Sequence, residues 1–457
     1  MDNHQKVSEE EYIGKNIRLP SKHEAPNVDM EVVNYHRPLL GTFHSKFMVV
    51  DRKHGILSSN NIQDNDNVEM MCHFEGPIVD SLYDTLLFSW SNPLEPSMPA
   101  IATPAVEGGL PTFNEPSFTG LFDQSGNLRV PEMGNARSLQ EVADDGKHQD
   151  LPLHVGGDPH YDDNIAGEIT RIQAALTPKN GEPMVNVVSR HLNLATHQSR
   201  APTAPDYKPG DEFTPYIPHA VHDLVPMAMV NRKPYGAANH AGVYMPQNEA
   251  WIAAVRHAQR DVFIQTPDLN AAPLLPELIA AVRRGITVTY YVCLGYNDAG
   301  ELLPGQGGHN EGVANKLCLE LKNAEERSRL NIHYYVGKDQ TKPIHNKFKS
   351  RSCHVKVMIV DGHIGIMGNG NQDTQTWYHS QEVNIMLDSE SICHKWREGI
   401  DRNQNTLKYG KASQEDGIWR DAEGNEAEGA IGKDPGRFSW AKGVVGAVQR
   451  VRGAGGF

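Results

Sequence analysis

Hydrophobic and polar positions alternate most regularly between residues 245 and 400. There, apolar residues at helical spacing are followed repeatedly by short runs of β-branched and aromatic residues. Helices are predicted over 249–259, 273–285 and 313–329, and strands over 261–266, 286–294 and 331–336. A Gly-rich stretch over 295–312 predicts a loop. Repeated helices and strands of this kind are typical of a layered βα half-domain.

The rest of the chain has a weaker pattern. Between 96 and 240, Pro, Gly, Asp and Asn are dense, and only 160–176 has a helical pattern. We therefore predict four parts. They are a first half-domain over 1–95, an irregular inserted connection over 96–240, a second half-domain over 241–400 and a loop-rich C-terminal tail over 401–457.

One polar motif occurs in both half-domains. The pattern H-x-K-x4-D lies within a run of apolar residues, and an Asn follows its His by seventeen positions. A single match is expected by chance in about one chain in twenty. Two copies with the same apolar filler and the same later Asn indicate a duplication. The first copy consists of His44, Lys46, Asp51 and Asn61, and the second of His354, Lys356, Asp361 and Asn371.

Strand geometry explains the spacing. Residues i and i+2 of a strand point to the same face, so the His and the Lys of each copy emerge side by side. The Asp lies where the strand turns, and Asp361-Gly362 is typical of a two-residue hairpin, so Asp51 and Asp361 are predicted to be structural anchors. The chain then returns to the level of the His, where the amides of Asn61 and Asn371 can donate to an oxyanion.

These residues resemble the duplicated pattern H-x-K-x4-D-x6-G-S-x-N of the phospholipase D superfamily. Two positions depart from it: Ser58 stands where the pattern has Gly, and Asn369 where it has Ser. Residues 368–389 are most similar to a fungal phospholipase-D-like subgroup. The resemblance implies an α/β, phospholipase-D-like fold with two βα sandwich lobes, which are related by pseudo-twofold symmetry and share one active site.

The resemblance also implies phosphodiester chemistry with two histidines. A neutral imidazole attacks phosphorus to form a phosphohistidine, and a protonated imidazole donates to the leaving alcohol. By the family's usual division of labour, His44 is the nucleophile and His354 the general acid. The phosphate would be held by Lys46, Lys356, Asn61 and Asn371. By the same resemblance, the carboxylates that orient the imidazoles would be Glu69 and Glu382.

The expected partner is a phospholipid at a membrane surface, whose phosphatidyl group is hydrolysed or transferred. The alternatives are a cardiolipin-synthase-type phosphatidyltransferase, a nuclease, and an inactive or fragmentary binding protein. A net charge of −14, from 43 Lys and Arg against 57 Asp and Glu, disfavours nucleic acid. Two motifs in one chain disfavour the small homodimeric nucleases and favour a monomer.

Neither a metal nor another cofactor is expected. The 22 His include no H-E-x-x-H motif, and a Lys beside each motif His would repel a cation. Five Cys, without C-x-x-C spacing, are typical of reduced thiols. The sequence also has no leader-like N-terminus and no apolar run of membrane-spanning length. A cytoplasmic protein that can bind a membrane peripherally is therefore expected.

The first lobe is expected to be incomplete at its N-terminus. Ninety positions separate Ile264 from His354, whereas only 43 residues precede His44. Residues 30–35 match 331–336, the last strand predicted before the second motif. The first half therefore lacks the helices and strands that precede this strand in the second half. We therefore expect Met1 to lie downstream of the true start of this domain. In the alternative, residues 95–240 fold back to provide the missing strands.

Overall fold

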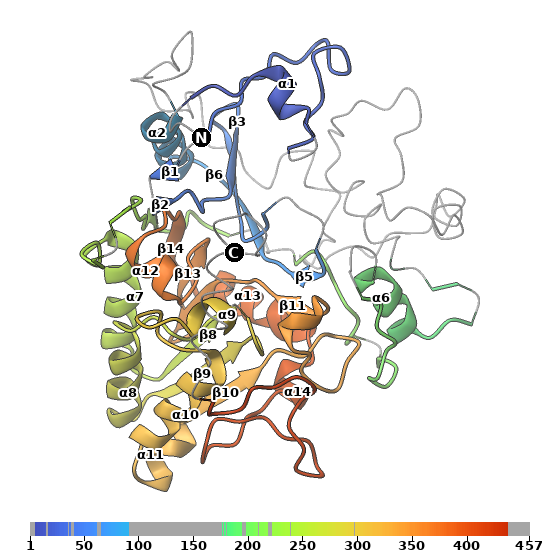
Figure 1. Cartoon of the computed structure of the whole chain (residues 1–457), viewed down its shortest axis with the longest axis vertical. Coiled ribbons are helices and arrows are strands. Elements are labelled where there is room, and N and C mark those ends of the chain that lie inside the picture. The colour runs from blue at the N-terminus through green and yellow to red at the C-terminus, as the bar shows by residue number, and fades with distance from the viewer. Residues whose placement is uncertain are drawn as a thin grey trace.

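The computed structural model has two unequal lobes (Figure 1). It describes residues 5–90 and 176–436, apart from short gaps at 15–16, 35, 38–40, 62–64, 177, 180, 194–197, 209, 218–221, 238 and 297. The smaller first lobe, drawn in blue, lies at one end of the larger second lobe, drawn from green to red. The α/β class predicted from the sequence is confirmed.

A seven-stranded mixed sheet forms the centre of the second lobe. In spatial order its strands are β10 (Leu330–Tyr334), β9 (Thr287–Val292), β8 (Asp261–Gln265), β12 (Val357–Val360), β13 (Ile364–Gly368), β14 (Asn384–Asp388) and β7 (Met227–Met229). The first three are parallel, and each later neighbour is antiparallel. The edge strand β7 lies within 96–240, so the sheet of the second lobe begins before residue 241.

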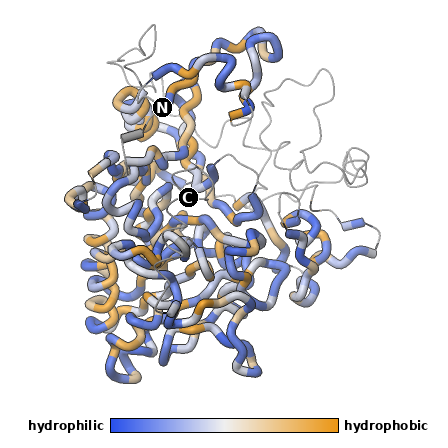
Figure 2. The backbone as a smooth tube through the Cα atoms, in the orientation of Figure 1, coloured by the Kyte–Doolittle hydropathy of each residue, from blue (hydrophilic) through white to orange (hydrophobic). Residues whose placement is uncertain are grey.

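Both faces of this sheet are covered. One face packs against α7 (Pro246–His257), α8 (Leu275–Arg283) and α10 (Asn310–Glu320), and the other against α13 (Glu390–Arg402). Adjacent strand residues alternate between the two cores: Ile264 faces the first and Phe263 the second. Hydrophobic and hydrophilic stretches alternate along α7 and α8 in Figure 2, at the place that Figure 1 gives these helices. The continuous apolar runs in the sequence therefore reflect strands that are buried on both sides.

The first lobe contains a three-stranded antiparallel sheet within the described residues. Its strands are β3 (Phe47–Val50), β4 (His54–Ser58) and β6 (Met71–Glu75), in this order. The helix α2 (Ile78–Trp90) covers one face, where Leu57, Phe74 and Leu82 join the core that underlies α13. One core therefore extends from the first lobe into the second.

The two motif strands end in matching hairpins. Val50 pairs with His54, and Val360 pairs with Ile364, so each connection has three residues. The two-residue turn predicted at Asp361-Gly362 is therefore one residue longer. Asp51 and Asp361 both have a φ of 52°, in the left-handed region that a tight reversal requires.

The remaining elements are short. They are α1 (Glu9–Tyr12), β1 (His36–Arg37), β2 (Gly41–Thr42), β5 (Asn67–Val68), α6 (Met184–Leu192), α9 (Asp298–Glu301), α11 (Ala324–Arg329), β11 (Ser352–Cys353), α12 (Thr374–Tyr378), α14 (Thr406–Tyr409) and a 3-10 turn at Asn346–Phe348. Within the described residues, no helix is long and apolar enough to cross a membrane.

Several predicted boundaries change. The helix predicted over 313–329 is two helices, because Leu321 is extended and Asn323 caps α11 by accepting a hydrogen bond from the amide of Glu326 at 2.7 Å. The predicted loop at 295–312 contains α9. In the tail, the side chains of Ala412, Trp419 and Ala427 are buried in the main core. Residues 30–34, the described part of the predicted 30–35 match, lie in no strand, and Val33 makes a single bridge with Lys6. Residues 160–175 lie outside the described residues.

Candidate active site

His354 is positioned by a pairing between the two lobes. The short strand β11 runs parallel to β5 of the first lobe, with Cys353 opposite Val68. The amide of His354 donates to the carbonyl of Val68 at 2.8 Å. The next residue of the first lobe is Glu69, and both of its carboxylate oxygens lie 3.1 Å from His354 Nδ1.

His44 is held in the same way by the second lobe. Phe43 forms a parallel bridge with Gln381, and the amide of His44 donates to the carbonyl of Gln381 at 3.1 Å. The carboxylate of Glu382 then lies 2.9 Å and 3.0 Å from His44 Nδ1. Each histidine therefore contacts the glutamate that belongs to the other copy of the motif.

The two imidazoles present equivalent atoms to the site. His44 is 6% exposed and His354 is 1% exposed. Within the described part of the chain, the Nε2 atom of each has no hydrogen-bond partner. Since a carboxylate faces Nδ1, the favoured tautomer carries its proton there and leaves a lone pair on Nε2. The ring of Tyr296 stacks on His354 with the ring centroids 5.9 Å apart.

The lysines of both copies also lie in equivalent positions. Lys46 donates from Nζ to the carbonyl of His44, and Lys356 donates to the carbonyl of His354 at 2.6 Å. Burial, opposed by the charge of a glutamate, lowers the pKa of Lys46 to about 7 and that of Lys356 to about 8. The repulsion between the two ammonium groups lowers the pKa of Lys46 further. A bound anion would relieve this repulsion.

The two His–Glu pairs differ in their electrostatics. Burial, followed by the charge of Lys46, lowers the pKa of His44 well below its usual range. Burial raises the pKa of its partner Glu382 well above the usual range. Burial, followed by the charge of Lys356, lowers the pKa of His354 to about 4. Burial would also raise the pKa of Glu69, but the charge and hydrogen bond of His354 lower it to about 2.

A comparison with known families agrees with the fold and the motif. Residues 251–403 match the family model described as "Cardiolipin synthase, PLD-like domain". This range contains His354, Lys356, Asn371 and Glu382. These residues of the chain are therefore similar to a phospholipase-D-like domain. Members of the phospholipase D superfamily are phosphodiesterases and phosphatidyltransferases.

Several solved structures are similar to the chain at low sequence identity. A phosphatidylserine synthase from Haemophilus influenzae Rd KW20 is 12% identical with a TM-score of 0.41, covering 91% of this chain and 70% of its own. Nuc from Salmonella typhimurium, a phospholipase D family member, is 13% identical with a TM-score of 0.28, covering 41% of this chain and 97% of its own. NucT from Helicobacter pylori is 12% identical with a TM-score of 0.27, covering 41% and 99%. No curated protein matches the chain.

The two departures from the phospholipase D pattern have structural consequences. Asn369 accepts a hydrogen bond from the amide of Lys46 at 3.1 Å and donates to the carbonyl of Ser58 at 2.6 Å, so it joins the second motif to the first lobe. At Gly368 of the second copy there is no room for a side chain, because an added Cβ would lie 2.4 Å from the carbonyl oxygen of Val383. The first copy has Ser58 at the equivalent position and therefore accommodates a side chain there.

The two asparagines of the phospholipase-D-like motifs lie in different settings. Asn371 is buried and donates to Asp373 at 3.0 Å, while its Oδ1 has no partner among the described residues. Asn61 is half-buried. Asp373 and the buried Asp268 were not predicted from the sequence. The pKa of Asp268 is raised well above its usual range by burial and then by the charge of Asp373. Neither aspartate belongs to the duplicated motif, so the sequence carried no signal for them.

The carboxylate of the predicted anchor Asp361 binds backbone amides. It accepts hydrogen bonds from the amides of Gln259, Arg260 and Asp261 at 2.7–3.0 Å, just where β8 begins. It therefore joins the end of one strand to the start of its neighbour. Asp51 occupies the equivalent turn of the first copy.

Proposed function

We propose that this chain cleaves or transfers a phosphodiester, and that its substrate is a phospholipid. One observation supports this proposal above all. Two imidazoles from different lobes each face a carboxylate through Nδ1, while both buried Nε2 atoms lack a partner within the described residues. Two lysines lie beside them. Such an arrangement can surround a phosphate with one nucleophile, one acid and two positive charges.

In the first step, the lone pair of His44 Nε2 attacks phosphorus. The bond between phosphorus and the leaving oxygen breaks, and the proton on His354 Nε2 moves to that oxygen, which leaves as an alcohol. The product on the enzyme is a phosphohistidine. Lys46 and Lys356 stabilise the non-bridging oxygens as negative charge accumulates on them.

In the second step, His354 has become a neutral base. It takes a proton from water or from an incoming alcohol, whose oxygen attacks phosphorus. The bond between phosphorus and nitrogen breaks, and its electron pair returns to His44. Both histidines are then in their starting states, and the acceptor determines whether the result is hydrolysis or transfer.

The electrostatics of the two pairs support His44 as the nucleophile. A nucleophile must be neutral, and the strongly lowered pKa of His44 favours that form. A general acid must be protonated, whereas a pKa of about 4 leaves His354 neutral at pH 7 before substrate binds. The carboxylate of Glu69, with a pKa of about 2, remains ionised and would stabilise the imidazolium that His354 has to form. The negative charge of a bound phosphate would further favour protonation of His354.

The assignment of a phospholipid rests on the description of the matching family, which names cardiolipin synthase. The net charge of −14 agrees with it, because a strongly acidic chain has no general attraction for nucleic acid. Transfer between phospholipids, as in a cardiolipin synthase, uses the same two steps with a lipid alcohol as acceptor. The inactive alternative is less well supported, because both His–Glu pairs and both lysines are present.

The test is turnover on a panel of phospholipids and one DNA oligonucleotide, with and without a primary alcohol such as butanol. We expect phosphatidic acid without butanol and an additional phosphatidylbutanol with it, because both acceptors compete for the same intermediate. Cleavage of the oligonucleotide with no action on lipid would favour a nuclease. No turnover of any phosphodiester would leave only the binding protein.

The lowered lysine pKa values predict a pH dependence. We expect kcat/KM to fall as the pH rises, most steeply above pH 7 to 8, because Lys46 loses its proton at about 7 and Lys356 at about 8. The protonated form is the active one, so the loss lies on the alkaline side. The pKa of His354 in the free site, about 4, lies below this range, so His354 does not contribute to this fall. A profile measured from about pH 6 to about pH 9 checks this, and a rise across that range would contradict it.

A further inference from the structure

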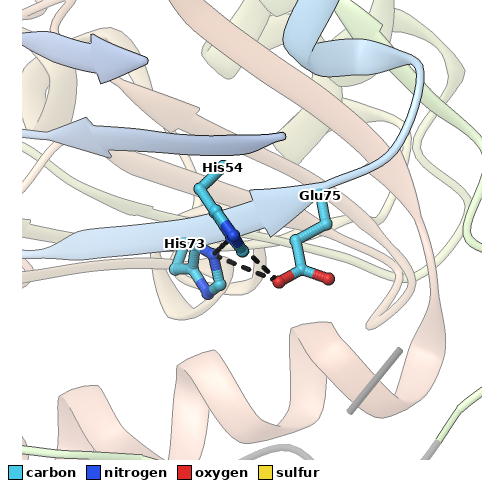
Figure 3. A group of neighbouring side chains, drawn as sticks. All are labelled: His54, His73 and Glu75. Atoms are coloured by element: carbon cyan, nitrogen blue, oxygen red, sulfur yellow. Dashed lines mark hydrogen bonds and ion pairs between the residues drawn. The ribbon is translucent and has the colours of Figure 1, made fainter. Parts of the chain in front are cut away.

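Two histidines and a glutamate converge on the first-lobe sheet, outside the phosphodiester site. His54 of β4 is paired in register with Glu75 of β6, and His73 precedes Glu75 by two residues. All three side chains therefore lie on the same face of the sheet. The opposite face is the one that packs on α2, where an added Cβ at Gly55 would lie 2.5 Å from Phe74. Figure 3 shows the three side chains meeting at one point.

The distances between the three polar atoms are those of a metal site. His54 Nδ1 lies 3.2 Å from His73 Nε2 and 3.1 Å from Glu75 Oε1, and the third separation, from His73 Nε2 to Glu75 Oε1, is 3.6 Å. Tetrahedral zinc, with bonds of about 2.0–2.1 Å, holds its ligand atoms about 3.3 Å apart. The three atoms thus approximate one face of a zinc tetrahedron.

Hydrogen bonds among the three side chains explain these short distances less well than a bound cation does. His54 Nδ1 faces both His73 Nε2 and Glu75 Oε1 at similar distances, but it carries at most one proton. A cation placed between the three atoms accepts an electron pair from each of them.

We propose that His54, His73 and Glu75 bind a zinc ion, with water in the fourth position. Two imidazoles and one carboxylate suit zinc and similar transition metals, whereas magnesium and calcium prefer oxygen ligands alone. This site has no local sequence motif, because its ligands lie on two paired strands. The three side chains are 12–35% exposed, so an ion can reach them from solvent.

The position of the site indicates a structural role. His54 and Glu75 lie at the ends of β4 and β6 that are farthest from Ser58 and Met71, where the chain approaches the phosphodiester site. Four residues along a strand place the ion about 13 Å from Ser58. A zinc ion would therefore hold β4 against β6 in the small first-lobe sheet without taking part in the reaction.

The first experiment measures zinc binding and stability on the full chain. After treatment with a chelator and its removal, zinc is titrated against the wild type, His54→Ala, His73→Ala and the control His363→Ala. His363 lies on the hairpin after the second motif, and its side chain pairs with the carboxylate of Asp388 at 2.9 Å. We expect the wild type and the control to bind one more zinc ion than the two cluster variants, whose affinity at this site falls at least ~100-fold.

Zinc should also raise the melting temperature of the wild type and of the control by several degrees, and leave the two cluster variants unchanged. Equal binding by all four proteins would overturn the proposal, as would an equal thermal shift. A second measurement needs no variant. Cobalt added to the wild type should give the intense visible absorption of a tetrahedral ion, which zinc displaces. The weak absorption of octahedral cobalt alone would overturn the proposal too.

Discussion

Replacing His44 by Asn is expected to abolish turnover, with a loss on the order of 10⁴-fold or more, because no other group can form the covalent intermediate. Replacing His354 by Asn should cost about 10²- to 10⁴-fold with a natural substrate, because the leaving alkoxide then departs without a proton. The measurement is kcat/KM for a phospholipid, together with the melting temperature of each variant to exclude unfolding.

An activated substrate separates the two roles. An aryl phosphodiester releases a stable phenolate, so its cleavage requires a nucleophile but little help from an acid. With this substrate, we expect His354→Asn to recover much of the rate of the first step. The variant should then accumulate a phosphohistidine that can be isolated by rapid denaturation. His44→Asn should show neither effect. Recovery by His44→Asn, or a label on His354 of the wild type, would reverse the assignment.

The second lobe was largely predictable from the sequence because its elements are both regular and deeply buried. The runs at 261–266 and 286–294 became β8 and β9 within two residues at each end, since β-branched and aromatic residues fill a sheet that is covered on both faces. The break between α10 and α11 at Leu321 could not be predicted from the apolar pattern, because Asn323 also fits the interior of a continuous helix. The edge strand β7 has only three residues, too few for a periodicity.

The contacts between the lobes could not be predicted. The duplicated motif identified both histidines and both lysines, and the resemblance to the family identified both glutamates. What brings them together are β5 and β11, which have two residues each, and a single bridge between Phe43 and Gln381. Such short pairings leave no periodic pattern. The assignment of each glutamate to the histidine of the other copy therefore needed coordinates. The pseudo-twofold relation of the whole lobes stays a prediction.

The second prediction follows from the contact of each glutamate with the histidine of the other motif copy. In Glu69→Gln and Glu382→Gln, an amide group can donate to the neighbouring Nδ1, which forces the proton onto Nε2 and removes the tautomer that the reaction needs. A comparable change in a Ser-His-Asp triad costs about 10⁴-fold, so we expect losses of about 10³- to 10⁴-fold in kcat/KM for both variants. Ser59→Ala removes a hydroxyl that donates to Glu69 at 2.6 Å and accepts from the amide of Met70 at 2.8 Å, but it leaves the carboxylate in place, so the loss should stay within about 10-fold.

The aryl phosphodiester then shows which histidine each glutamate serves. Glu69 contacts His354, the proposed acid, so Glu69→Gln should regain much of its activity with a leaving group that needs no proton. Glu382 contacts His44, the proposed nucleophile, so Glu382→Gln should stay impaired with either substrate. If each glutamate instead served the histidine of its own copy, the rescue would appear in Glu382→Gln and be absent from Glu69→Gln. The pattern of rescue therefore tests the pairing between the lobes in solution, independently of how large each loss is.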